Sequence, residues 1–201
     1  MDKQAQRDLE ELLARDMDGV AVPPPPVARP TDVARRWDLP ARDVEALMRW
    51  GLPLLNEDGE LPSHLPSADF QSELLPQLDL SVPTGGPFDP EHHRGVGLSA
   101  YRLAASDWLT YGVVRGEGSV CAIRNRTSAA TALVNTSVAA FVECSWRWWR
   151  ALDIIGPLED EDDETYWWCL ERFAEWSVGI DPQAKVRSPV EQSWWESVAL
   201  S

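Results

Sequence analysis

The spacing of apolar side chains predicts helices near both ends of the chain. Leu9, Leu12, Leu13 and Met17 repeat at helical intervals and predict an amphipathic helix over residues 3–18. Further helices are predicted over about 31–38, over Ala41–Trp50 with a stop at Gly51, from an N-cap among Asn135, Thr136 and Ser137 to about Leu152, over Thr165–Val178, and around Trp194 and Trp195. The helix over 165–178 is predicted to turn inward Trp167, Leu170, Phe173, Ala174 and Val178.

Strand signals occupy the middle of the chain. Aromatic and β-branched residues mix over Tyr101–Ala104, Trp108–Val114 and Ser119–Ile123, and a further short strand is predicted over Thr131–Val134. The sequence RGEG at Arg115–Gly118 is typical of a tight turn, so it predicts an antiparallel hairpin. Helices, then a meandering sheet, then helices again indicate an α+β fold.

Two proline-rich stretches divide the chain. The four prolines at Pro23–Pro26 form a stiff spacer, which predicts that residues 1–29 are a separable amphipathic arm with its linker and that residues 30–201 are the main domain. Residues 51–93 hold eight acids and seven prolines without one Lys or Arg. This composition predicts extended segments and turns in place of long helices.

The charge of the chain narrows the classes of partner. Eighteen basic residues against 33 acidic ones give a net charge of −15. Nucleic acids and anionic membranes attract cationic surfaces, so this balance argues against both and permits a basic protein as partner. The sequence has no apolar run long enough to span a membrane, and its charged N-terminus lacks the apolar core of a signal peptide. We therefore expect a cytoplasmic protein.

Candidate catalytic groups are few. His64 lies in a proline-rich stretch, and Asp89, Glu91, His92 and His93 lack the spacing of a known metal motif, so a solvated loop is expected there. The sequence contains no nucleophile elbow, phosphate-binding loop or dinucleotide fingerprint. The three cysteines have neither disulfide nor metal spacing and are expected as free thiols. These observations predict that the protein is not an enzyme and holds no cofactor or metal.

One segment indicates a different class of function. Residues 31–53 resemble a helix-turn-helix of the excisionase sort, with Arg35, Arg36, Arg42 and Arg49 available to phosphates. Four acids in the same segment offset these arginines, so a helix pair that packs in the core is the simpler interpretation. A DNA-associated regulatory protein is the alternative function.

Several short segments, in order along the chain, resemble a known family. The sequence VNTSVAAFVECSWRW at Val134–Trp148 follows the strands and opens a helix. It resembles the SUKH superfamily, most of all its fourth group, immunity proteins of bacterial polymorphic-toxin systems common in actinobacteria. The segments that agree in order are Gly51–Pro53, Gly118–Val120 in the hairpin, Gly179–Ala184 and Ser193–Trp195. The resemblance spans about residues 31–197 and leaves the N-terminal arm outside.

The resemblance implies a mixed, mainly antiparallel β-sheet packed by helices at both ends of the chain. It also implies a protein that binds a cognate toxin, often a nuclease or deaminase. Toxins that act on nucleic acid tend to be cationic, so an acidic inhibitor gains association rate and complementarity.

The expected contacts with such a toxin are carboxylates with aromatic anchors. The candidates are Glu159, Asp160, Glu161, Asp162, Asp163, Glu164, Asp89, Glu91, Trp146 and Trp168. On a helix Trp146 and Trp148 point about 160° apart. We therefore expect one tryptophan of Trp146, Trp148 and Trp149, and one of Trp167 and Trp168, to reach the surface.

Overall fold

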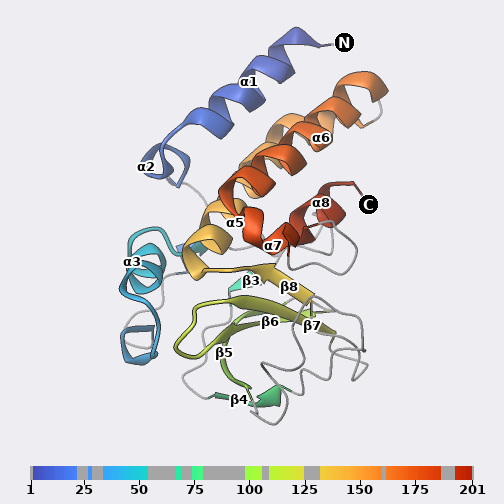
Figure 1. Cartoon of the computed structure of the whole chain (residues 1–201). Coiled ribbons are helices and arrows are strands. Elements are labelled where there is room, and N and C mark those ends of the chain that lie inside the picture. Colours follow the sequence, from blue (N-terminus) through green and yellow to red (C-terminus); the bar gives the residue numbers. More distant parts are fainter. Residues whose placement is uncertain are drawn as a thin grey trace.

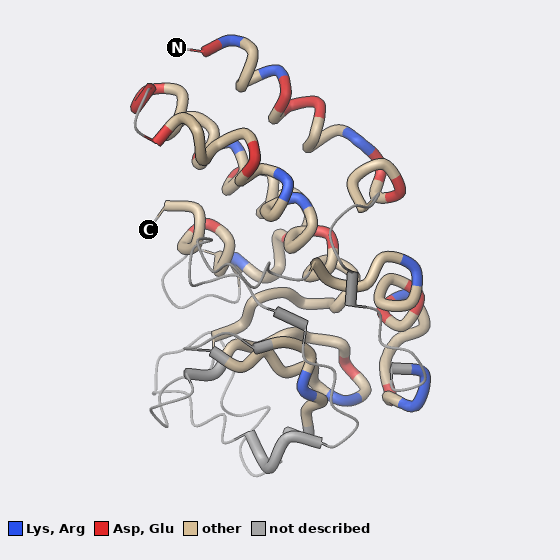
Figure 2. The backbone as a smooth tube through the Cα atoms, turned by 180° about the vertical axis from the view of Figure 1, so that it is seen from behind, with Lys and Arg blue, Asp and Glu red and all other residues tan. Residues whose placement is uncertain are grey.

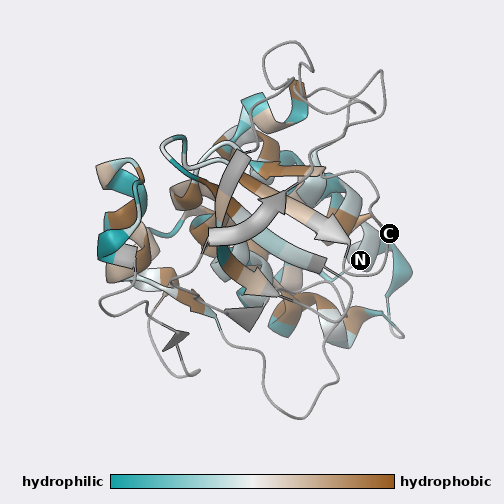
Figure 3. Cartoon of the chain, turned by 90° about the horizontal axis from the view of Figure 1, so that it is seen from below, coloured by the Kyte–Doolittle hydropathy of each residue, from teal (hydrophilic) through white to brown (hydrophobic). Residues whose placement is uncertain are grey.

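The structure, a computed structural model, stacks its helices over one face of a β-sheet (Figure 1). It describes residues 2–21, 27–28, 34–53, 67–68, 74–78, 98–105, 109–124, 132–159, 162–186 and 193–200. Helix α5 (Val138–Ile155) and two short C-terminal helices contact the sheet, and α6 (Asp163–Ile180) and α1 (Lys3–Ala14) pack on α5 farther from the sheet. Seen from below, the strands cross in front of this helical layer (Figure 3).

The sheet is a meander whose order follows the chain. Strands β5 (Leu98–Ala105), β6 (Leu109–Val114), β7 (Val120–Arg124) and β8 (Ala132–Asn135) pair in sequence. Strands β3 (Ser67–Ala68) and β4 (Leu74–Leu78) both pair with β5, while β1 (Val27–Ala28) and β2 (Leu52–Pro53) form a separate pair. The α+β class and the predicted β6–β7 hairpin are confirmed, and every pairing among the described strands is antiparallel.

Helix α5 is central and meets other elements on opposite sides. Trp146 is fully buried, and its indole N–H donates to the Gly51 carbonyl oxygen at 3.1 Å. Trp148 packs instead against Phe173 of α6, with ring centroids 4.8 Å apart. Among the three tryptophans of α5, only Trp149 is partly exposed. The prediction that Trp146 contacts a partner is therefore wrong, because the elements packed around α5 cover both directions in which its tryptophans point.

The N-terminal helix belongs to the core. Leu9 and Leu13 lie in the same buried cluster as the apolar side chains of α5 and α6. Arg147 of α5, itself buried, donates to the carbonyl oxygens of Leu12 at 2.6 Å and Arg15 at 2.8 Å. The division of the chain at residue 29 stays a prediction, but α1 is not a loosely attached arm, because packing on α5 and α6 buries its apolar face.

The remaining described elements are short, apart from α3. They are α2 (Met17–Val20), η1 (Ala34–Arg36), α3 (Ala41–Arg49), η2 (Gly156–Leu158), α7 (Pro182–Val186) and α8 (Trp194–Ala199). Helix α3 is confirmed, and Gly51, with a φ of 65°, follows it as predicted. The predicted helix over 3–18 is divided into α1 and α2 at Asp16, whose side chain caps α2.

A buried polar junction joins β8 to the C-terminal helices. The Asp181 carboxylate accepts hydrogen bonds from the Thr136 N–H (2.6 Å), the Thr136 hydroxyl (2.8 Å) and the Asn135 amide (3.2 Å). The Trp195 indole N–H donates to Asn135 Oδ1 at 2.9 Å. These residues come from the segments that carried the family resemblance. In this fold they satisfy one another's buried polar groups, so their role is structural.

Candidate partner-binding site

The described part of the acidic run lies at the start of α6. Glu159 is exposed in the turn before the helix, and Asp163 and Glu164 are exposed in its first turn, where the helix dipole favours negative charge. Figure 2 shows acidic positions along α6 and along the neighbouring α1. Four predicted contact residues lie outside the described residues: Asp89, Glu91, Asp160 and Glu161. These three residues are therefore the exposed carboxylates within the described part of the predicted surface.

Asp162 differs from the other acids of the run because it has structural partners. It caps α6 by accepting the Thr165 N–H at 3.1 Å and the Thr165 hydroxyl at 2.7 Å, and it also accepts the Asp2 N–H at 2.8 Å. The hydrogen bonds from Thr165 lower the pKa of this carboxyl to about 2. A partner that also engaged Asp162 would compete with the helix cap and with the attachment of α1.

We expect the Asp162 cap to make the stability of the protein depend on pH in acid. The pKa of Asp162 is about 2 in the folded chain against an ordinary value of 3.8. Its contribution is therefore present above about pH 4 and is lost as the pH falls towards 2. In urea unfolding between pH 5 and pH 2, Asp162→Asn should flatten the dependence of the unfolding free energy on pH. Asp163→Asn, at an exposed position, is the control, and equal slopes for both variants would contradict the assignment.

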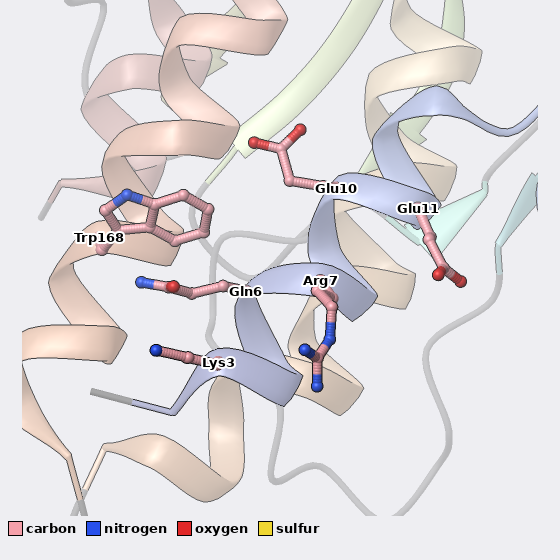
Figure 4. Close-up of a pocket in the computed structure, with 6 residues that line it drawn as sticks. All are labelled: Lys3, Gln6, Arg7, Glu10, Glu11 and Trp168. Atoms are coloured by element: carbon pink, nitrogen blue, oxygen red, sulfur yellow. The ribbon is translucent and has the colours of Figure 1, made fainter.

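The adjacent tryptophans of α6 have different surroundings. Trp167 is 50% exposed, so its predicted inward orientation is wrong, although the expectation that one of the pair reaches the surface is confirmed. The buried face of α6 includes Cys169 and Phe173, and Trp167 points about 160° away from Cys169. Trp168 is half-buried and lines a pocket of about 480 Å³ between α1 and α6 (Figure 4).

The α1 side of this pocket carries mixed charges. Its lining residues are Lys3, Gln6, Arg7, Glu10 and Glu11. The Glu10 carboxylate accepts two hydrogen bonds from Arg172 of α6, at 2.6 and 3.2 Å, and these lower the pKa of Glu10. These α1 residues were not predicted to line a site, because the sequence indicated that α1 lies outside the main domain. The helical spacing of Lys3, Gln6 and Glu10 is the signal that places them on one face of α1.

The geometry of residues 34–53 does not favour a helix-turn-helix. Within the described residues, Ala34–Arg36 form a 3₁₀ turn, and α3 packs against α5. Asp43 of α3 is buried, its Oδ1 accepts the Ala139 N–H of α5 at 3.0 Å, and burial raises its pKa. Arg49 pairs with Asp18. One face of α3 therefore packs in the core, as expected for a core-packing helix.

The described residues offer little catalytic or metal chemistry. No three His, Cys, Asp or Glu side chains gather among them as a metal ion would require, and His64, His92 and His93 lie outside them. Cys121, Cys144 and Cys169 are buried free thiols. Burial raises the pKa of Cys169 to about 11 and that of Cys144 well above its usual value, so both are protonated at neutral pH and are poor nucleophiles.

Among the residues that the structure describes, no helix is both long enough and apolar enough to cross a membrane.

A meander sheet packed by helices, with the NTS, DP and SWW segments joined at one buried junction, defines an α+β protein. The comparison with known families agrees with the resemblance seen in those segments. A model of the SUKH-4 immunity protein family matches residues 6–201, so the chain belongs to that family. The match starts inside α1 and thus includes most of that helix. No curated protein and no solved structure gives a significant match.

Membership of this family supports an immunity function and implies a cognate toxin as partner. Immunity proteins of this kind are generally non-enzymatic.

Proposed function

We propose that the protein binds a cognate polymorphic toxin directly and neutralises it in the cytoplasm without turnover. The toxin is a basic protein that acts on nucleic acid, such as a nuclease or deaminase. The contact surface includes the acidic run Glu159–Glu164 at the start of α6, together with Trp168 beside it. Asp89 and Glu91 are the further acidic candidates that the sequence contributes.

The observation that carries this proposal is the exposure of Glu159, Asp163 and Glu164 on a chain whose net charge is −15. Opposite charge on a toxin accelerates association and penalises wrong partners. The half-buried ring of Trp168 lies nearby on the same helix and supplies aromatic surface, which is enriched among the residues that dominate binding energy.

Co-expression with candidate toxins from the native bacterium tests the function. The tagged protein is used to recover a stoichiometric basic partner, and that partner is then expressed with and without the protein. Relief of the partner's toxicity is the expected result. Recovery of DNA or of a housekeeping complex, with no toxin neutralised, would overturn the proposal and favour the regulatory alternative.

Charge reversal on the acidic run tests the surface. Glu159→Lys with Glu164→Lys should weaken toxin binding about tenfold or more, mainly through a slower association rate at low salt, because the attraction between opposite charges is reduced. Asp162 is left intact so that α6 keeps its cap. The control is Glu45→Lys with Glu117→Lys, which changes the net charge equally at exposed positions on α3 and on the β6–β7 turn. Equal losses in both double variants, measured by surface plasmon resonance, would show that net charge alone matters.

A further inference from the structure

The exposed face of α6 continues well beyond the acidic run. Glu164, Trp167, Glu171 and Glu175 follow one another at intervals of three or four residues, and each is exposed. This spacing places them on one side of the helix, along about 16 Å of its length. A row of exposed carboxylates therefore runs along α6, and the ring of Trp167 lies between Glu164 and Glu171 in this row.

Trp167 is unusual among the exposed side chains of the described residues. The large hydrophobic side chains exposed there are Trp167, Val186 and Leu200, and Trp167 is the aromatic one. Its ring makes an edge-on contact with Tyr166, with centroids 5.6 Å apart. Burial, followed by the negative charge of Glu159, raises the pKa of Tyr166, the neighbour of Trp167.

We infer that this face of α6 receives a basic segment of the toxin, with an arginine side chain stacked on Trp167. The inference rests on the proposed function and names the anchor of its binding surface. A guanidinium over an indole ring gains cation–π attraction, and Glu164 and Glu171, on either side of Trp167 along the helix, supply carboxylates to pair with it. The neighbouring pocket at Trp168 suits a cation less well, because Lys3 and Arg7 line it beside the acidic Glu10 and Glu11, whereas Glu164 and Glu171 flank Trp167.

Two sets of variants test the inference against the recovered toxin. Trp167→Ala should weaken toxin binding at least tenfold, and Trp167→Phe should restore part of the loss because it keeps an aromatic face. Glu164→Lys with Glu171→Lys should also weaken binding at least tenfold, whereas Glu45→Lys with Glu117→Lys should stay within about twofold of wild type. Wild-type affinity in Trp167→Ala, or equal losses in the two charge-reversal pairs, would overturn the inference. Thermal melts by circular dichroism check that each variant is folded.

A measurement without toxin separates this inference from the proposed function. The fluorescence lost in Trp167→Phe reports Trp167, and its quenching by caesium ions is compared with its quenching by iodide at equal ionic strength, each divided by the quenching of the free indole analogue N-acetyltryptophanamide by the same ion. Stronger quenching by caesium is expected, because carboxylates surround the ring. Equal or stronger quenching by iodide would overturn the inference even if the wild-type protein neutralises a toxin. If caesium quenches more strongly but no toxin is neutralised, the proposed function fails, and with it the toxin as the occupant of this face.

Discussion

Replacing Gly118 by alanine is expected to destabilise the protein by about 3 kcal/mol or more. Gly118 has a φ of 80°, a conformation that costs an L-residue about 1–2 kcal/mol. An alanine Cβ would also overlap the carboxylate of Asp43 and lie 3.2 Å from Pro40 Cδ. Forcing an extra methyl group into a packed site adds about 1–3 kcal/mol. Asp43 cannot move aside at low cost, because it is buried and accepts the Ala139 N–H of α5.

Gly116 provides a matched control in the same turn. Its φ is 78°, but among the described residues, apart from Gly116 itself and its two chain neighbours, no atom lies within 4 Å of an added Cβ. Gly116→Ala should therefore cost only the conformational part, about 1 kcal/mol. Urea unfolding monitored by circular dichroism measures both variants. If the two substitutions cost the same, the contact between the β6–β7 turn and Asp43 does not determine stability.

Replacing Arg147 by methionine is expected to cost about 3 kcal/mol. The guanidinium donates to the carbonyl oxygens of Leu12 and Arg15 at the end of α1 and pairs with Glu143 at 2.9 Å. It also lies 5.0 Å from the ring centroid of Trp176. Methionine keeps most of the apolar stem but leaves these carbonyl oxygens without their donor, and each buried acceptor left without a hydrogen bond costs about 1–3 kcal/mol.

Arg150 of the same helix is the comparison for Arg147. It is half-buried, its Nε donates to the Val20 carbonyl oxygen at 3.2 Å, and its guanidinium lies 4.9 Å from the ring centroid of Trp149. Arg150→Met should cost about 1 kcal/mol. Hydrogen exchange gives a second readout, because Arg147→Met should speed amide exchange in α1 more than in the strands. If the amide exchange rates in α1 were the same in the wild type and in both variants, Arg147 would not be what holds this helix in the core.

The candidate site was predictable only in part. The acidic run is visible in the sequence, but the contact that sets Asp162 apart from its neighbours is not, because Asp162 accepts the N–H of Asp2 from the distant start of the chain. The sequence indicated a partner contact for Trp146 and an inward orientation for Trp167, but Trp146 is buried and Trp167 is exposed. Helical periodicity shows which residues share a face of a helix. It does not show how many of those faces pack against another element. Helix α5 is enclosed on opposite sides, whereas α6 keeps an open face.

The sequence by itself determined the local structure and the class of fold. Apolar spacing, capping residues and turn glycines act over a few residues, so α3, α5, α6 and the β6–β7 hairpin could be located from the chain alone, and the ordered segments indicated the family. Only the tertiary structure decided what each element packs against. The placement of α1 in the core, the junction of Asn135, Asp181 and Trp195, and the exposure of Trp167 all arise from contacts between residues distant in sequence. Burial is a property of the assembled chain, because each side chain is covered by neighbours that local spacing does not specify.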